Sequence, residues 1–75
     1  MYAMDAQAGD ALGTFHAVVT RDGEALSRDG SPYFDVNQVH ESNPRPGDGV
    51  LYEVQFADGL WMLARDADLT PNSPA

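Results

Sequence analysis

Two histidines and a set of carboxylates are the side chains in this sequence that could take part in catalysis. A catalytic histidine needs a nucleophile or an orienting carboxylate within hydrogen-bond reach. His40 follows Asp35 by five residues and precedes Glu41 by one, and because both spacings are odd, neither carboxylate shares a strand face with it. We therefore interpret His16 and His40 as exposed strand-end histidines, and we predict no catalytic residue and no enzyme activity.

Asp66 and Asp68 form a D-x-D pair beside an expected turn, a spacing at which carboxylates can hold Ca²⁺ or Mg²⁺. Calcium loops use more oxygen ligands and a glycine at a fixed offset, whereas this run ends after two carboxylates. Capping of a short terminal turn is therefore the favoured role of the pair. The chain contains no cysteine, which excludes thiolate zinc sites and iron–sulfur clusters. We predict neither a metal nor a cofactor.

Acidity is the most distinctive property of the composition. Twelve Asp and Glu residues stand against four Arg and no Lys, so the formal net charge is −8. A field of this sign repels nucleic acid and anionic membranes and attracts basic surfaces. One interpretation is that the charge only keeps a small protein soluble; the other is that an acidic face meets a basic partner. We predict a protein partner, with no direct contact to nucleic acid or membrane.

Seventy-five residues make one domain with a small core. Residues 1–12 are rich in alanine and small polar residues and favour a loose arm or a short helix. We expect a single β domain over residues 13–70 and, because two prolines fall there, a disordered tail over residues 71–75. The sequence has neither a signal-peptide pattern at its start nor an apolar run long enough to span a membrane, so a cytoplasmic location is expected.

The clearest local pattern is a hairpin around Asp58-Gly59. Residues 50–57 alternate as a strand with one apolar face, and a second apolar segment covers residues 60–65. An Asp-Gly pair suits a two-residue type I′ turn, which fixes the register of the flanking strands. This register puts Phe56 opposite Trp61, so we expect Trp61 in the core.

Three further segments read as weaker strands. Residues 14–20 alternate, and Asp22-Gly23 predicts a turn into a short return arm over residues 24–28. A turn at Asp29-Gly30 then leads to a strand over residues 33–40. In that strand Phe34 and Val36 would point inward, with a bulge or strand end near Asn37. The two prolines of residues 43–49 predict a rigid, exposed loop.

Short strands at roughly ten-residue spacing favour an all-β fold, either a small barrel or a strongly bent antiparallel sheet of four to five strands. Residues 51–71 resemble the end of small bacterial SH3-like and Tudor-like barrels, in which a Y-x-V-x-F strand, an Asp-Gly turn, a second strand and a closing D-L-x-P turn recur. The opening strand of those barrels, with its glycine-rich loop, is not evident in residues 1–20. The resemblance implies a binding role and names no ligand.

These observations predict a non-catalytic protein-binding module whose acidic surface engages a basic partner. One concrete form is a nucleic-acid-mimicking inhibitor of a nucleic-acid-binding protein. The alternative is a structural or accessory subunit that docks on a larger assembly through an apolar patch. Trp61 and the two tyrosines Tyr52 and Tyr33 could belong to the core or, as in a Tudor- or SH3-like ligand site, line an aromatic groove; the core is the favoured place for Trp61. The predicted partner-binding residues are Tyr33, Tyr52, Glu53, Asp58, Asp66 and Asp68.

Overall fold

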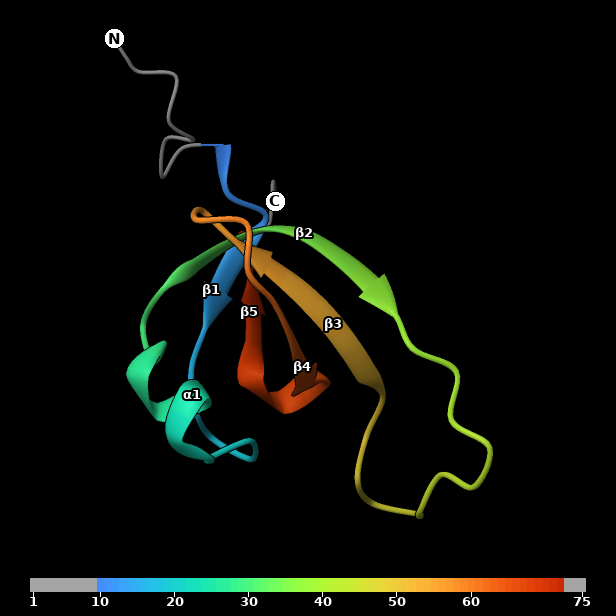
Figure 1. The fold of residues 1–75 in the computed structure, drawn as a ribbon. Helices are drawn as coiled ribbons and strands as arrows, with labels where there is room; N and C mark the ends of the chain where they lie inside the picture. The colour runs from blue at the N-terminus through green and yellow to red at the C-terminus, as the bar shows by residue number, and fades with distance from the viewer. Residues whose placement is uncertain (1–9, 73–75) are drawn as a thin grey trace, which may run out of the picture.

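A computed structural model of the protein describes residues 10–72 as a five-stranded antiparallel sheet with the strand order β4-β3-β2-β1-β5 (Figure 1). The strands are β1 (Gly13–Phe15), β2 (Pro32–Gln38), β3 (Leu51–Phe56), β4 (Trp61–Arg65) and β5 (Leu69–Pro71), joined by the short helix α1 (Gly23–Ser27) and the 3₁₀ turn η2 (Asp66–Asp68). The expected mostly-β fold is confirmed. None of the helices in this part of the chain has the length and apolar character that crossing a membrane requires.

The β3–β4 hairpin differs from the predicted one by a single residue. Gln55 lies opposite Trp61, whereas Phe56 was expected there. The connection has three residues, because the Phe56 N–H donates to the Leu60 carbonyl and the Gly59 N–H donates to the Phe56 carbonyl. Gly59 has a φ of 90°, as a type I turn followed by a bulge requires. A one-residue shift moves a whole strand to the opposite face. The core position predicted for Trp61 is therefore wrong: its exposed fraction is 40%.

The segment after β1 also departs from the predicted hairpin. The strand ends at Phe15 instead of continuing to residue 20, and the residues expected to form the return arm are α1. Asp22 caps that helix, since its side chain accepts a hydrogen bond from the Ala25 N–H at 2.9 Å. An Asp-Gly pair therefore begins a helix here, because the Glu-Ala-Leu-Ser segment that follows has good helix propensity and little strand propensity.

Strand β2 contains its irregularity three residues earlier than expected. Its register against β3 shifts between Tyr33 and Asp35, so Tyr33 and Val36 both reach the concave side of the sheet. The predicted inward pair was Phe34 and Val36, but Phe34 lies at the bulge and is only half-buried. The chain then leaves the sheet in the long loop up to Val50, which projects away from the strands (Figure 1).

Strand β1 lies between β2 and β5, and glycine is needed at its start. Gly13 is opposite both Tyr33 and Pro71. A Cβ atom at this position would come within 2.5 Å of the Tyr33 hydroxyl and of the Thr70 carbonyl oxygen, so any larger residue would push the strands apart.

The chain remains ordered beyond the predicted end of the domain. Pro71 is the last residue of β5, and Asn72 hydrogen-bonds to Leu12 and Ala11, although a disordered tail was expected from residue 71. Ala11 and Leu12 belonged to the predicted arm and are anchored by these bonds. Residues 1–9 of that arm and residues 73–75 of the predicted tail lie outside the described residues.

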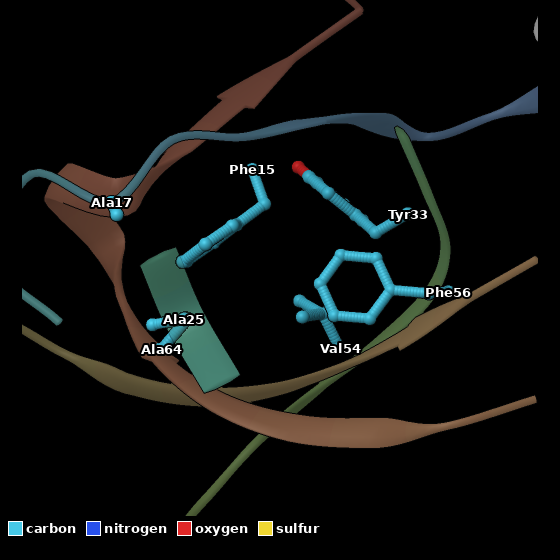
Figure 2. Packing of buried hydrophobic residues seen from close by; sticks show 7 residues of the cluster. All are labelled: Phe15, Ala17, Ala25, Tyr33, Val54, Phe56 and Ala64. Carbon is cyan, nitrogen blue, oxygen red and sulfur yellow. The ribbon is translucent and has the colours of Figure 1, made fainter. Parts of the chain in front are cut away.

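The core lies on the concave side of the sheet (Figure 2). Phe15 and Phe56 meet edge to face with ring centroids 5.9 Å apart, and Val54 is fully buried beside them. Tyr33 and three alanines complete the cluster: Ala17 comes from the loop after β1, Ala25 from α1 and Ala64 from β4. The small alanine side chains allow the helix and the loop to approach the aromatic residues closely.

Candidate functional site

An apolar pocket lies on the concave side of the sheet in the described part of the chain. Its volume is about 490 Å³, within the range of ligand pockets. The pocket is built from β2, β3, the η2–β5 segment and the residue before β1. It is lined by Leu12, Tyr33, Val36, Tyr52, Asp66, Leu69 and Pro71. Three of the six predicted partner-binding residues, Tyr33, Tyr52 and Asp66, therefore meet at one place.

Tyr33 and Tyr52 supply the aromatic part of the pocket and differ in exposure. The exposed fraction of Tyr33 is only 3%, whereas Tyr52 is half-buried. Burial raises the pKa of the Tyr33 phenol, and the nearby Tyr52 phenol raises it further. The Tyr33 side chain is therefore neutral at physiological pH. Tyr33 thus forms part of the pocket floor, and Tyr52 offers an accessible ring.

Among the residues that the structure describes, Asp66 is the only charged side chain in the pocket lining. Its position is fixed on both sides, because its N–H donates to the Val50 carbonyl at 3.0 Å and its carboxylate lies against Gly49. Gly49 has a φ of 80° and no room for a Cβ atom next to this carboxylate. Across residues 10–72 no cation forms a salt bridge with Asp66. The pocket therefore combines apolar walls, a partly exposed tyrosine ring and one carboxylate that forms no salt bridge within the described residues.

Asp68 lies in the interior, which corrects its assignment to the partner-binding surface. It has no exposed surface and accepts hydrogen bonds from the N–H groups of Val18, Val19, Thr20 and Arg65 and from the Thr20 hydroxyl. Burial alone would raise the pKa of the Asp68 carboxyl, but these hydrogen bonds outweigh burial and hold the pKa below its ordinary value. Asp68 ties the loop after β1 to the end of β4.

Asp58 is exposed at the hairpin tip, as expected, but its charge is already paired. Arg28 donates two hydrogen bonds to the Asp58 carboxylate, at 2.8 and 3.2 Å, and a third to Glu24 at 2.9 Å. The hydrogen bond from Arg28 lowers the pKa of Asp58, and the Leu60 N–H lowers it further. The Arg28 guanidinium also lies 5.0 Å from the ring centroid of Phe56. We therefore leave Asp58 out of the candidate site.

Glu53 lies on the opposite, convex side of the sheet and is not part of the pocket. It is opposite Leu63 on β4 and accepts a long hydrogen bond of 3.4 Å from the Asn37 amide. Trp61 also lies on the convex side of the sheet, because it is two residues from Leu63 along β4 and side chains two residues apart in a strand share a face.

Sequence reasoning missed four pocket residues: Leu12, Val36, Leu69 and Pro71. Leu12 and Pro71 had been assigned to the arm and the tail, because neither segment carries a periodic apolar pattern. No local pattern connects them, because they come together only in the folded sheet, where β5 pairs with β1 and places Leu12 and Pro71 at the same pocket.

The two histidines do not gather with other polar groups into a reactive cluster. His16 Nδ1 lies 3.7 Å from Asp29 Oδ1, beyond normal hydrogen-bond distance, and both side chains are about half exposed. His40 lines a smaller hollow of about 300 Å³ beside Glu41 and Pro44. Among residues 10–72 no group of three or more His, Asp or Glu side chains is placed to hold a metal ion.

Comparison with known proteins gives no relative: no family model, no curated protein and no solved structure matches the chain. What the pocket could bind must therefore be inferred from the residues that line it. Apolar walls can cover the aliphatic stem of a long side chain, and an aromatic ring beside a carboxylate can receive its cationic end.

Proposed function

We propose that this protein is a non-catalytic protein-binding module that receives a basic side chain of its partner in the Tyr52–Asp66 pocket. The observation that carries the proposal is the Asp66 carboxylate, which forms no salt bridge among residues 10–72, at an otherwise apolar, tyrosine-lined pocket. A lysine or arginine of the partner would lay its methylene groups along Val36 and Leu69 and present its charge to Asp66 and to the Tyr52 ring.

The distribution of charge supports a basic partner. Two of the four arginines are paired with carboxylates within the fold, since Arg28 pairs with Glu24 and Asp58 and Arg65 pairs with Glu41. The formal net charge of −8 then acts mainly through carboxylates without a cationic partner. Such a surface speeds the approach of a basic protein and keeps nucleic acid away. An inhibitor that occupies the nucleic-acid site of a basic protein remains one concrete form of this proposal.

An SH3-like barrel is the finer description of the fold that we propose. It is supported by the order of features after residue 50: a strand with the pattern Y-x-V-x-F, a turn at Asp58-Gly59, a second strand and the D-L-x-P segment of η2 and β5. In barrels of this kind the resemblance implies binding rather than catalysis, in agreement with the proposed pocket.

The proposal can be tested with two capped peptides, Ac-Leu-Lys-Leu-NH₂ and Ac-Leu-Glu-Leu-NH₂, followed by NMR shift titration of the labelled protein. We expect the lysine peptide to shift Tyr52 and Leu69 resonances and to bind more weakly as salt rises from 50 to about 300 mM. Asp66→Asn should weaken binding several-fold. Glu24→Gln, which removes an exposed carboxylate of α1 outside the pocket lining, is the control and should leave binding unchanged.

Two outcomes would overturn this assignment. Equal affinity of Asp66→Asn and the parent would remove the pocket carboxylate from the function. Affinity for both peptides that salt does not alter would instead support the alternative, an accessory subunit that docks through apolar contact.

A further inference from the structure

Strand β4 forms one edge of the sheet, and its backbone there is open. Within the described residues β4 pairs only with β3. The pairing of Phe56 with Leu60 and of Val50 with Asp66 shows that even-numbered residues of β4 direct their N–H and C=O groups toward β3. The odd-numbered residues Trp61 and Leu63 therefore direct theirs outward. At the end of the strand the Arg65 N–H is satisfied by Asp68, so the open stretch is Trp61 to Leu63.

The side chains at this edge are apolar and exposed. Trp61 and Leu63 have exposed fractions of 40% and 52%, and they lie on the convex side of the sheet. Sheet proteins usually protect an edge strand with lysine, proline or an inward charge to prevent pairing with another chain. Between residues 61 and 64 β4 has none of these. An open backbone edge beside a tryptophan and a leucine is the arrangement that receives an added strand.

The neighbouring charges decide which strand would be added. Glu53 lies directly opposite Leu63, and Asp35 is on the same side of β2, opposite Gln55. No cation in the described part of the chain forms a salt bridge with either carboxylate, and the one arginine of this face, Arg65, is held by Glu41. A second copy of the chain would bring another charge of −8 to this edge, so self-pairing is disfavoured.

We propose that the Trp61–Leu63 edge of β4 binds an extended, basic segment of a protein partner by strand addition. Backbone hydrogen bonds to Trp61 and Leu63 hold the segment, and its alternate side chains on the convex side are apolar or basic. The apolar ones pack on Leu63, and the basic ones stack on the Trp61 ring or pair with Glu53. The surface shares no lining residue with the Tyr52–Asp66 pocket, so the two proposals stand independently.

The test uses the whole protein and the capped peptide Ac-Val-Lys-Val-Lys-Val-Lys-NH₂, with Ac-Val-Glu-Val-Glu-Val-Glu-NH₂ as its control. Amide hydrogen exchange is followed residue by residue. We expect the lysine peptide to slow exchange at the Trp61 and Leu63 amides while the Met62 amide, already bonded to β3, changes little. The glutamate peptide should have no effect at the same concentration.

A pair of variants separates the backbone from the side chain. Leu63→Ala removes the side chain and keeps the outward N–H, whereas Leu63→Pro removes that N–H as well without touching a β3–β4 hydrogen bond. We expect Leu63→Pro to bind the lysine peptide on the order of fivefold more weakly than Leu63→Ala, the weight of one lost hydrogen bond. If Leu63→Pro does not fold, the exchange data on the parent protein decide the matter.

Three results would overturn the proposal. The first is unchanged exchange at Leu63 when the lysine peptide is bound elsewhere. The second is equal protection by the glutamate peptide, which would remove the charge argument. The third is protection of Leu63 in the protein alone that grows with protein concentration, together with dimer formation, which would make a second copy the occupant.

Discussion

The Thr20 hydroxyl donates a 2.6 Å hydrogen bond to Asp68 Oδ2 across 48 residues of sequence. Asp68 also accepts backbone N–H groups from both ends of this connection, so one buried carboxylate fixes the loop after β1 against η2. An amide at this position would turn a donor toward some of those N–H groups. Asp68→Asn should therefore lower the free energy of unfolding by about 3 kcal/mol, measured by urea denaturation. Asp66→Asn, two residues away and exposed, is the control and should change it by less than about 0.5 kcal/mol.

The hydroxyl of Thr20 can be tested separately. Thr20→Val keeps the shape of the side chain and removes the donor, so it should cost about 1–2 kcal/mol in the same denaturation experiment. Thr20→Ser keeps the donor and should cost less than Thr20→Val. If the two variants have the same free energy of unfolding, the hydrogen bond from the Thr20 hydroxyl to Asp68 does not contribute to stability.

The lowered pKa of Asp68 makes part of the stability depend on pH. Its ordinary pKa is 3.8 and its folded value lies below that, so the unfolded chain takes up the proton first as the pH falls. The contribution of Asp68 is therefore complete well above pH 3.8 and is lost as the pH falls through the folded pKa. Unfolding free energies at pH 7 and at pH 2–3 should show the difference between the parent and Asp68→Asn shrinking in acid. A difference that stays constant over this range would contradict the low pKa.

Sequence patterns identified the strands more reliably than their register. The alternation of residues 50–57 predicted β3, but both candidate registers place a glycine at a positive φ after Asp58, so the turn dipeptide could not choose between them. The sequence of β4 does not distinguish the two registers either, because Trp61 to Ala64 are apolar on both faces of the strand. The choice depends on packing, which buries the small Ala64 in the same core cluster as Val54 and leaves the tryptophan outside.

The pocket was predictable only in part, for a related reason. Two tyrosines and Asp66 were recognised by residue type, but the role of Asp68 depends on donors 48 to 50 residues away in sequence. Asp66 and Asp68 look equivalent in a D-x-D pair. A three-residue turn of η2 directs one carboxylate outward and the other inward, and no local pattern predicts which.

Trp61 should contribute little to stability in spite of its size. Because 40% of it is exposed on the convex side of the sheet, Trp61→Ala should cost less than about 1.5 kcal/mol, whereas Phe56→Ala, at a residue 3% exposed, should cost about 3–5 kcal/mol. Denaturation followed by circular dichroism makes the comparison without relying on the tryptophan signal. A loss as large for Trp61→Ala as for Phe56→Ala would mean that the ring is buried in solution and that the predicted register was right.

Two glycines of the long loop provide a test of how Asp66 is positioned. Gly47 and Gly49 both have a positive φ, of 90° and 80°, so alanine at either should cost about 1 kcal/mol in backbone strain. A Cβ atom at Gly47 meets nothing within 4 Å, whereas at Gly49 it meets the Asp66 carboxylate. Gly49→Ala should therefore destabilise the protein more than Gly47→Ala and should also weaken binding of the lysine tripeptide, because Asp66 is pushed from the pocket rim.

The double variant Gly49→Ala with Asp66→Ala distinguishes displacement of Asp66 from a general effect on the loop. With the carboxylate gone, the added methyl group has room, so the extra cost of Gly49→Ala over Gly47→Ala should disappear in a double-mutant cycle measured by urea denaturation. Peptide binding should stay weak in the double variant, because the charge that receives the lysine is missing. If the extra cost persists without the Asp66 side chain, backbone strain alone explains it, and Gly49 has no part in placing Asp66 at the pocket.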